Sequence, residues 1–273
     1  MKFRTLSPIG TLNAESFACP PAHDVPESKN MWRSLERVRR DWNRYAEEDP
    51  LWAILTDPRK KERGWDAAEF FETGRREIDE LMRYAGTLPA QAGRRRALDF
   101  GCGVGRLTRA LADHFEEVFG VDISPVMIEL AHEHNSHVAN CRFVQNPDPG
   151  FRALPCREFD LIYSNITLQH MPPRFAKRYL RGMAGMLAPG GLLIFQLPGE
   201  ERMPLRARVW RTLYEEYRRY ILRAHPSMDM FGVRRERVIA LFERSGCRIL
   251  DIAEMPGDPE RPNYRYAVVR GRT

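Results

Sequence analysis

The stretch ALDFGCGVGRLT, residues 97–108, decides the fold, because it sets three glycines between an apolar run and an apolar helical pattern. RRALDFG predicts a β-strand, and GRLTRALADHF predicts a helix with Leu107, Leu111 and Phe115 on one face. Glycine between two such elements lets the backbone turn tightly and approach a ligand without a Cβ in the way. The pattern predicts a ligand site where a strand leads into a helix N-terminus.

Strands and helices alternate beyond this loop. Further strands are predicted at 117–124, 141–146, 159–165, 192–198, 247–255 and 264–271, with helices at 125–134, 174–187 and 233–246. Pro189, Gly190 and Gly191 predict a turn into the fifth strand. The alternation indicates an α/β fold, Rossmann-like and doubly wound, with a mostly parallel seven-stranded sheet. The last two strands, joined by a short turn, must pair antiparallel.

The remaining segments predict a division of the chain into three parts. Residues 1–30 have four prolines and no apolar period, which is typical of a poorly ordered arm. Residues 31–92 predict an N-terminal helical cap, and residues 93–273 the α/β domain. A charged, aromatic-rich segment at about 199–230 predicts a helical lid inserted after the fifth strand.

Two classes of cofactor compete for the glycine loop. A dinucleotide requires G-x-G-x-x-G, but Arg106 occupies the place of the third glycine. Asp99 before the loop would repel a pyrophosphate, whereas an acid suits a cationic amine. Asp122 ends the second strand, where a carboxylate can accept both hydroxyls of a ribose. These residues favour a nucleoside that carries an amino acid.

The ordered segments LDFGCGVGRLT, VDIS, FDLIYSNITLQHM and MLAPGGLLIF resemble the motifs of class I S-adenosylmethionine-dependent methyltransferases. The resemblance covers about residues 94–197, and the C-terminal helix and strand pair extend it. It implies S-adenosylmethionine as the cofactor. It also implies that Asp99 holds the methionine amine through water and that Asn165 lies beside the sulfonium. The remaining implied cofactor contacts are Gly101 and Gly103 with the methionine part, Asp122 with the ribose, and Ile123, Met127 and Asn146 with the adenine.

The N-terminal segments DWNRYAEEDPLWAILTDP and FFETGRREID resemble the leader of bacterial methyltransferases of small metabolites. The resemblance implies helices that close over the cofactor. Trp42, Tyr45 and Trp52 are candidate lid contacts, because an aromatic face suits a sulfonium cation, although ordinary amphipathic packing explains them too. Arg75 is a candidate partner for the methionine carboxylate, with a solvated helix face as the alternative.

A general base is needed only where the acceptor must lose a proton, and His170 is the candidate. A helix-start or packing role is the competing interpretation of this histidine. Four residues in or beside the insertion, Glu200, Glu201, His225 and Asp229, are further candidates to face the substrate. His132, His134 and His137 lack metal-site spacing, so no metal is expected.

Composition narrows the remaining possibilities. No run approaches about 20 apolar residues, and the N-terminus lacks an apolar signal core, so we expect a cytoplasmic protein without membrane contact. Five scattered cysteines indicate no disulfide framework. The net charge of +6 is spread among interleaved acids, which argues against nucleic acid as the partner.

The sequence therefore predicts a methyltransferase acting on an oxygen or nitrogen atom of a small-molecule acceptor. The arginine-rich insertion keeps an RNA or protein methyltransferase open as an alternative. A non-catalytic cofactor-binding regulator is the alternative of another class. Both a monomer and a homodimer remain compatible with the sequence.

Overall fold

The computed structural model describes residues 29–90, 92–200, 228–256 and 261–271, with five isolated positions between 206 and 217. The predicted arm lies outside these described residues except at its end, as does most of the predicted lid insertion. At the border of that insertion, the backbones of Gly199 and Gly232 touch, since a Cβ on Gly232 would lie 1.8 Å from the Gly199 oxygen.

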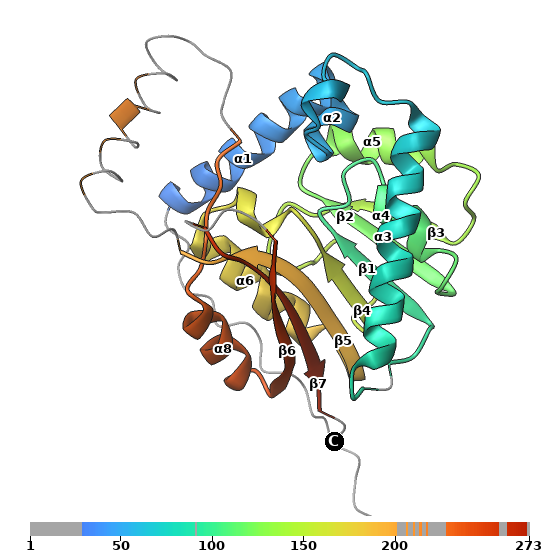
Figure 1. The fold of residues 1–273 in the computed structure, drawn as a ribbon, viewed down its shortest axis with the longest axis vertical. Coiled ribbons are helices and arrows are strands. Elements are labelled where there is room, and N and C mark those ends of the chain that lie inside the picture. The colour runs from blue at the N-terminus through green and yellow to red at the C-terminus, as the bar shows by residue number, and fades with distance from the viewer. Residues whose placement is uncertain are drawn as a thin grey trace, which may run out of the picture.

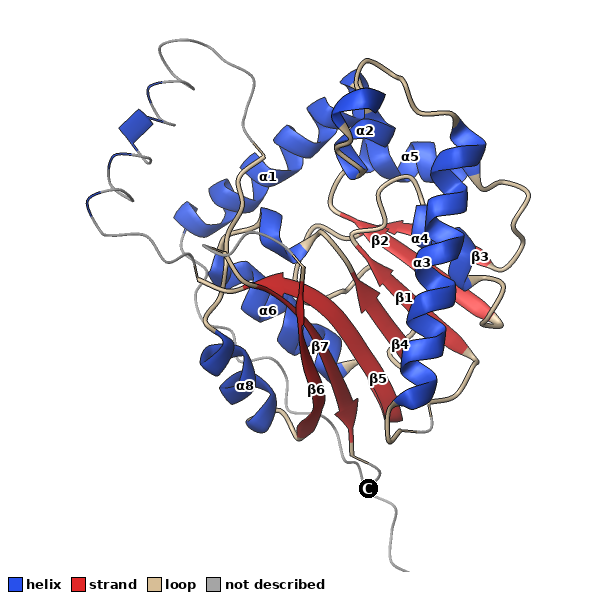
Figure 2. Cartoon of the chain, viewed as in Figure 1, coloured by secondary structure: helices blue, strands red, loops and turns tan. Residues whose placement is uncertain are grey.

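A seven-stranded sheet forms the centre of the molecule (Figures 1 and 2), in the order β3-β2-β1-β4-β5-β7-β6. The strands are β1 (Arg96–Phe100), β2 (Glu117–Asp122), β3 (Cys141–Gln145), β4 (Phe159–Ser164), β5 (Leu187–Pro198), β6 (Cys247–Met255) and β7 (Asn263–Arg270). The first five strands pair in parallel, and β7 pairs antiparallel with both β5 and β6. The predicted fold class is confirmed.

Helices cover both faces of the sheet. They are α1 (Lys29–Glu48), α2 (Pro50–Ile54), α3 (Ala67–Thr87), α4 (Arg106–Leu111), α5 (Pro125–His134), α6 (Pro173–Gly185) and α8 (Arg235–Glu243), with short 3-10 turns η1 (Pro58–Lys60) and η2 (Leu168–His170). One core cluster joins α6 and α8 to one face, and a second joins α3 and α4 to the other. Because strand side chains alternate, Leu98 and Phe100 point into the first cluster and Ala97 into the second.

Two predicted boundaries differ from the structure. The predicted turn at Pro189–Gly191 lies inside β5, which begins at Leu187 with an irregular register before Leu192. Gly191 permits this because a Cβ there would lie 2.7 Å from the Phe159 oxygen. Helix α4 ends at Leu111, and the chain reaches Phe115 through turns.

Side-chain caps fix where helices α3 and α5 begin. The Asp66 side chain accepts from the Glu69 N–H and begins α3, and Ser124 caps α5, which starts at Pro125. Helices α1 and α2, blue in Figure 1, lie beyond the carboxyl ends of the parallel strands, where ligands bind in doubly wound sheets. Within the described ranges, none of the helices has the length and apolar character needed to cross a membrane.

Candidate functional site

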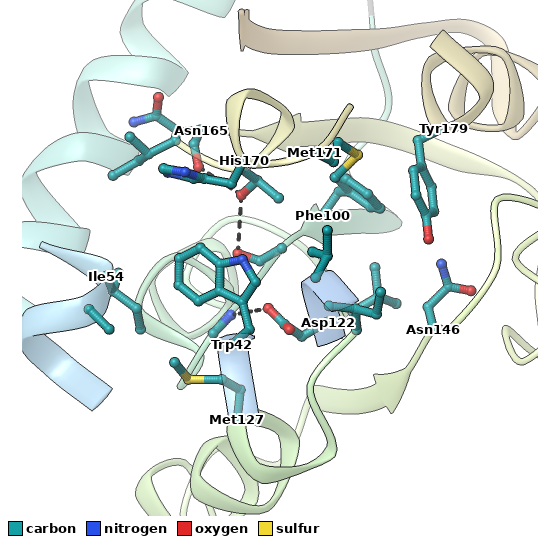
Figure 3. A pocket seen from close by; sticks show the side chains of 18 of the residues that line it. Trp42, Ile54, Phe100, Asp122, Met127, Asn146, Asn165, His170, Met171 and Tyr179 are labelled. Atoms are coloured by element: carbon teal, nitrogen blue, oxygen red, sulfur yellow. Dashed lines mark hydrogen bonds between the residues drawn. The ribbon is translucent and has the colours of Figure 1, made fainter. Parts of the chain in front are cut away.

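A cavity lies at the carboxyl ends of β1, β2 and β4, beneath α1 and α2 (Figure 3). It holds about 780 Å³ of space without protein atoms, part of which opens to solvent. Nine of the residues singled out in the sequence line it: Trp42, Gly101, Gly103, Asp122, Ile123, Met127, Asn146, Asn165 and His170. Residues that sequence reasoning missed, among them Ile54, Thr167 and Tyr179, complete the wall.

The two loop glycines let neighbouring side chains lie directly on the backbone. Gly101 has φ +80°, and a Cβ there would lie 2.1 Å from Cγ2 of Thr167. Gly103 has φ +52°, and a Cβ there would lie 2.5 Å from Cδ1 of Ile54. Both positions therefore need glycine for backbone angle and for space.

Asp122 is held at the end of β2 by backbone donors. Its Oδ2 accepts from the Gly103 N–H at 3.0 Å and its Oδ1 from the Ser124 N–H at 2.9 Å. Burial raises the pKa of Asp122, and these backbone hydrogen bonds oppose that shift. The carboxylate thus joins the glycine loop to the start of α5 and faces the cavity.

Asn146 follows β3 with its side chain buried and polar. It is 2% exposed, and neither Oδ1 nor Nδ2 has a hydrogen-bond partner among the described residues. Its backbone N–H donates to the Asp122 oxygen at 2.8 Å, which fixes it beside the second strand. A buried amide without partners is costly, so these two atoms are suited to a ligand in the cavity.

Asp99 does not line the cavity. On β1 it points, like Ala97, toward the α4 face, and Thr108 donates a hydrogen bond to its Oδ2 at 2.7 Å. Burial raises its pKa to about 7. The carboxyl group lies under the glycine loop and outside the cavity lining.

The structure does not bring Arg75 to the cavity and places it on a solvated helix face, which was the alternative interpretation of this residue. The buried face of α3 carries Phe70, Gly74 and Ile78. Arg75 lies on the solvent side, 62% exposed, with its Nε 2.9 Å from a Glu72 oxygen.

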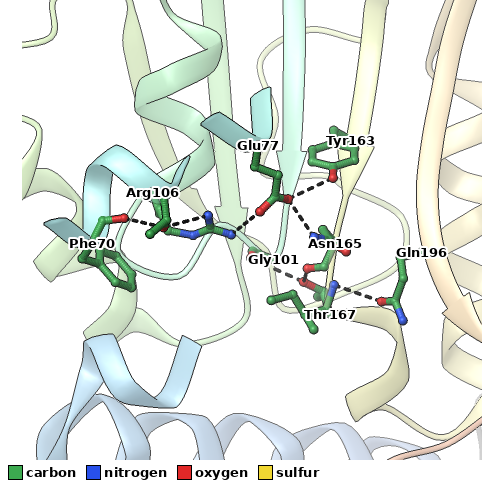
Figure 4. A network of polar contacts seen from close by, with 10 residues as sticks. Phe70, Glu77, Gly101, Arg106, Tyr163, Asn165, Thr167 and Gln196 are labelled. Atoms are coloured by element: carbon green, nitrogen blue, oxygen red, sulfur yellow. Dashed lines mark hydrogen bonds and ion pairs between the residues drawn. The ribbon is translucent and has the colours of Figure 1, made fainter. Parts of the chain in front are cut away.

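An acid on the buried face of α3 forms a polar network that sequence reasoning missed (Figure 4). Glu77 accepts from Arg106 at 2.8 Å, from the Tyr163 hydroxyl at 2.9 Å and from Asn165 Nδ2 at 2.7 Å. Arg106 is only 3% exposed. An arginine therefore stands at the position of the third glycine of the dinucleotide pattern because its guanidinium joins α4 to α3. The signal in the sequence was a glutamate seven residues after Phe70 and three after Gly74, a spacing that places it on their face of the helix.

His170 lies at the end of a chain of side-chain hydrogen bonds. Gln196 donates to Gln169 Oε1 at 3.0 Å, so the Gln169 amide nitrogen donates to His170 Nε2 at 3.1 Å. The Nδ1 of His170 then carries the proton and donates to the Asp229 oxygen at 3.1 Å. Burial lowers the pKa of His170 below its usual value. Both ring nitrogens are therefore engaged by neutral partners.

A second cavity adjoins the first. Its lining includes Arg37, Asp41, Tyr45, Asp229 and Phe231, and it shares Val38, Trp42 and His170 with the first cavity. The rings of Trp42 and His170 meet edge to face, with centroids 5.4 Å apart. The Trp42–His170 pair and Val38 therefore contribute to the lining of both spaces.

The other residues considered in the sequence lie elsewhere. Trp52 donates its indole N–H to the Asp57 oxygen and lines neither cavity. The imidazoles of His132 and His134 contact the rings of Phe143 and Phe71. In the parts of the chain that the structure describes, no group of side chains could hold a metal ion. Glu200 pairs with Arg234, while Glu201 and His225 lie outside the described residues.

Comparison with known proteins gives matches of two kinds. The sequence profile of a family described as a methyltransferase domain matches residues 97–191. A trans-aconitate 2-methyltransferase from Methylobacterium radiotolerans is 38% identical over 125 residues, which cover 44% of this chain and 45% of that protein. A ubiquinone biosynthesis O-methyltransferase from Coxiella burnetii is 28% identical over 170 residues, covering 62% of this chain and 70% of that protein. The chain spans about half the length of the trans-aconitate relatives it matches.

Solved structures share the fold. A magnesium protoporphyrin IX methyltransferase from Synechocystis, with bound S-adenosylhomocysteine, has a TM-score of 0.56 at 18% identity, covering 86% of this chain and 99% of that one. An N-methyltransferase from Bradyrhizobium japonicum, in complex with S-adenosylhomocysteine, has a TM-score of 0.54 at 18% identity, covering 85% and 98%. At this identity the likeness concerns the fold.

Proposed function

Because the chain carries a domain of the class I S-adenosylmethionine-dependent methyltransferase family over residues 97–191, we propose that it transfers a methyl group from S-adenosylmethionine to an oxygen or nitrogen atom of a small molecule. The single observation that carries this proposal is the set of polar groups that meets in the first cavity. Asp122, the glycine loop and the unpartnered amide of Asn146 lie on three neighbouring strand ends.

The residues present fit this cofactor. The carboxylate of Asp122 suits the two ribose hydroxyls, and Ile123 and Met127 supply apolar contacts for a base. Asn146 offers a buried acceptor and a buried donor for the edge of the adenine. Gly101 and Gly103 line the cavity where the methionine part would lie, and the side chains of Thr167 and Ile54 pack directly on them.

When bound, S-adenosylmethionine supplies a methyl group already activated by its sulfonium. The protein then has to align the acceptor with that methyl group and exclude water. Trp42 presents an aromatic face at the wall between the two cavities, where a cationic centre is stabilised. Asn165, held by Glu77, fixes the backbone after β4 on the opposite side.

The second cavity is the proposed place for the acceptor, since it adjoins the first and shares Val38, Trp42 and His170 with its lining. His170 acts there as a positioning residue. Its Nδ1–H holds the Asp229 backbone, and Arg37 holds the Asp229 carboxylate at 3.1 Å, so the segment is fixed from two sides. The trans-aconitate and ubiquinone-precursor relatives act on small molecules by their names, which supports the same class of acceptor here.

Isothermal calorimetry with S-adenosylhomocysteine tests the cofactor assignment. Asp122→Ala should weaken binding by about 1–3 kcal/mol, because a buried hydrogen-bonded carboxylate is lost. Asp113→Ala, which replaces an exposed acid just after α4, is the matched control and should bind as the parent protein does. Equal affinities for the parent and Asp122→Ala would remove Asp122 from the site, and no binding by the parent would refute the proposal.

Transfer of labelled methyl groups to a panel of small hydroxyl and amine compounds tests the reaction. Tyr45→Ala should raise the acceptor KM and leave the affinity for S-adenosylhomocysteine unchanged, since Tyr45 lines the second cavity but not the first. Label found only in added RNA or protein would favour that class of acceptor instead. Label in none of the acceptors, with cofactor bound, would favour a binding protein without catalysis.

A further inference from the structure

At the end of the first cavity, no hydrogen bond from the described residues fixes the orientation of the buried Asn146 side-chain amide. Both its polar atoms are buried and unpartnered among the described residues. None of these residues therefore fixes which side carries the oxygen and which the nitrogen. By contrast, the nearby Asn135 has its amide oriented, because its Nδ2 donates to the Val104 and Ala131 oxygens.

The backbone beside Asn146 offers no competing donor. The next residue is Pro147, which has no N–H. The backbone N–H of Asn146 itself donates to the Asp122 oxygen. The backbone at this point of the wall therefore leaves the side-chain amide of Asn146 as the donor that residues 146 and 147 can offer to a ligand edge.

Tyr179 of α6 does not fix the orientation of the Asn146 amide. It lines the same cavity, and Figure 3 shows its hydroxyl pointing toward the Asn146 side chain. A hydroxyl can donate or accept according to what faces it. It therefore accommodates either orientation of the amide.

A primary amide that is free to flip complements two different purine edges, one in each orientation. Adenine presents an acceptor at N1 and a donor at its 6-amino group, which Nδ2 and Oδ1 can meet together. Hypoxanthine presents a donor at N1 and an acceptor at its 6-oxo group, which the flipped amide meets equally well. A carboxylate in this place has acceptors only and satisfies the 6-amino group but not the 6-oxo group.

We propose that Asn146 makes the nucleoside site tolerant of the purine 6-substituent, so that it binds S-inosylhomocysteine about as well as S-adenosylhomocysteine. The inference rests on the proposed function, because it assigns the base to the first cavity. The structure provides the means in one residue, a buried amide whose orientation the ligand alone determines.

The test is calorimetry with both nucleosides on the parent protein and on three variants. The parent should bind the two within about threefold, since each edge finds two hydrogen bonds. Asn146→Asp should discriminate against S-inosylhomocysteine by more than about tenfold, because the 6-oxo group then faces an acceptor. Asn146→Leu should weaken both nucleosides by a similar factor. Gln145→Leu is the matched control, because the Gln145 amide has a partner in the Ile123 oxygen and lies outside the cavity lining.

The outcomes separate the two proposals. If the parent binds S-adenosylhomocysteine but binds the inosine analogue more than about thirtyfold more weakly, the amide has a fixed orientation and the inference fails alone. Unchanged affinity in Asn146→Leu, with the midpoint of unfolding preserved, would place the base elsewhere and also overturn it. If the parent binds neither nucleoside, the proposed function fails with it.

Discussion

Replacement of Glu77 by glutamine removes the charge that Arg106 faces inside the α3–α4 packing. Arg106 is 3% exposed, and its guanidinium lies 2.8 Å from a Glu77 carboxylate oxygen. Breaking a fully buried pair costs about 3–5 kcal/mol, because the remaining charge stays buried. Since the Glu77 side chain is 24% exposed, water reaches one side, and we expect about 2–3 kcal/mol. For a chain of this size that corresponds to roughly 4–12 °C in the midpoint of thermal unfolding.

The assay is differential scanning calorimetry of Glu77→Gln beside Glu72→Gln at one pH and salt concentration. Glu72 lies on the same helix, but its partners Arg75 and Arg76 are exposed, so its loss should leave the midpoint nearly unchanged. Arg106→Met should cost less than Glu77→Gln, because the acid left behind keeps two hydrogen bonds and some water. A fall for Glu77→Gln no larger than that for Glu72→Gln would refute the reasoning.

Three further outcomes are expected. Asp99 has a folded-state pKa raised from 3.8 to about 7, so the folded protein holds its proton where the unfolded chain has lost it, and stability should fall as pH rises across that window. Asp99→Asn should therefore gain stability over the parent as the pH rises from about 4 to about 7 in urea titrations, and an unchanged difference would contradict the buried acid. Gly101→Ala should lose at least about 1–2 kcal/mol in the same titrations from its left-handed backbone alone, and parent-like stability would show that the loop can shift away from Thr167. His170→Gln should raise the acceptor KM and leave the pH dependence of kcat as in the parent, whereas a lost pH limb would make the imidazole a base.

The elements of the sheet were predictable because their signals are local. The alternation of apolar strands with helices, and the proline and serine at the start of α5, lie within short windows of sequence. The positions of Asp122 and Asn146 in the cavity lining were predictable because each lies at or directly after the end of a parallel strand. Contacts across long separations were not predictable in this way.

Glu77 and Asn165 are 88 residues apart, and their hydrogen bond depends on how α3 lies against β4. Arg75 shows that residue type alone is not enough. A guanidinium suits a carboxylate, but the position of Arg75 on the helix, next to the buried Gly74, turns it to solvent. Asp99 shows the effect of strand alternation, which turns its side chain under the glycine loop, toward Thr108 of α4. Its contact with the methionine amine through water stays a prediction.

The touching backbones of Gly199 and Gly232 place the end of β5 and the return of the chain before α8 at one point. The Val233 N–H donates to the Pro198 oxygen at 2.9 Å, so a backbone hydrogen bond also joins the exit and the return. The length of the chain between them can then change at little cost to the sheet, because closing a loop costs free energy only logarithmically in its length.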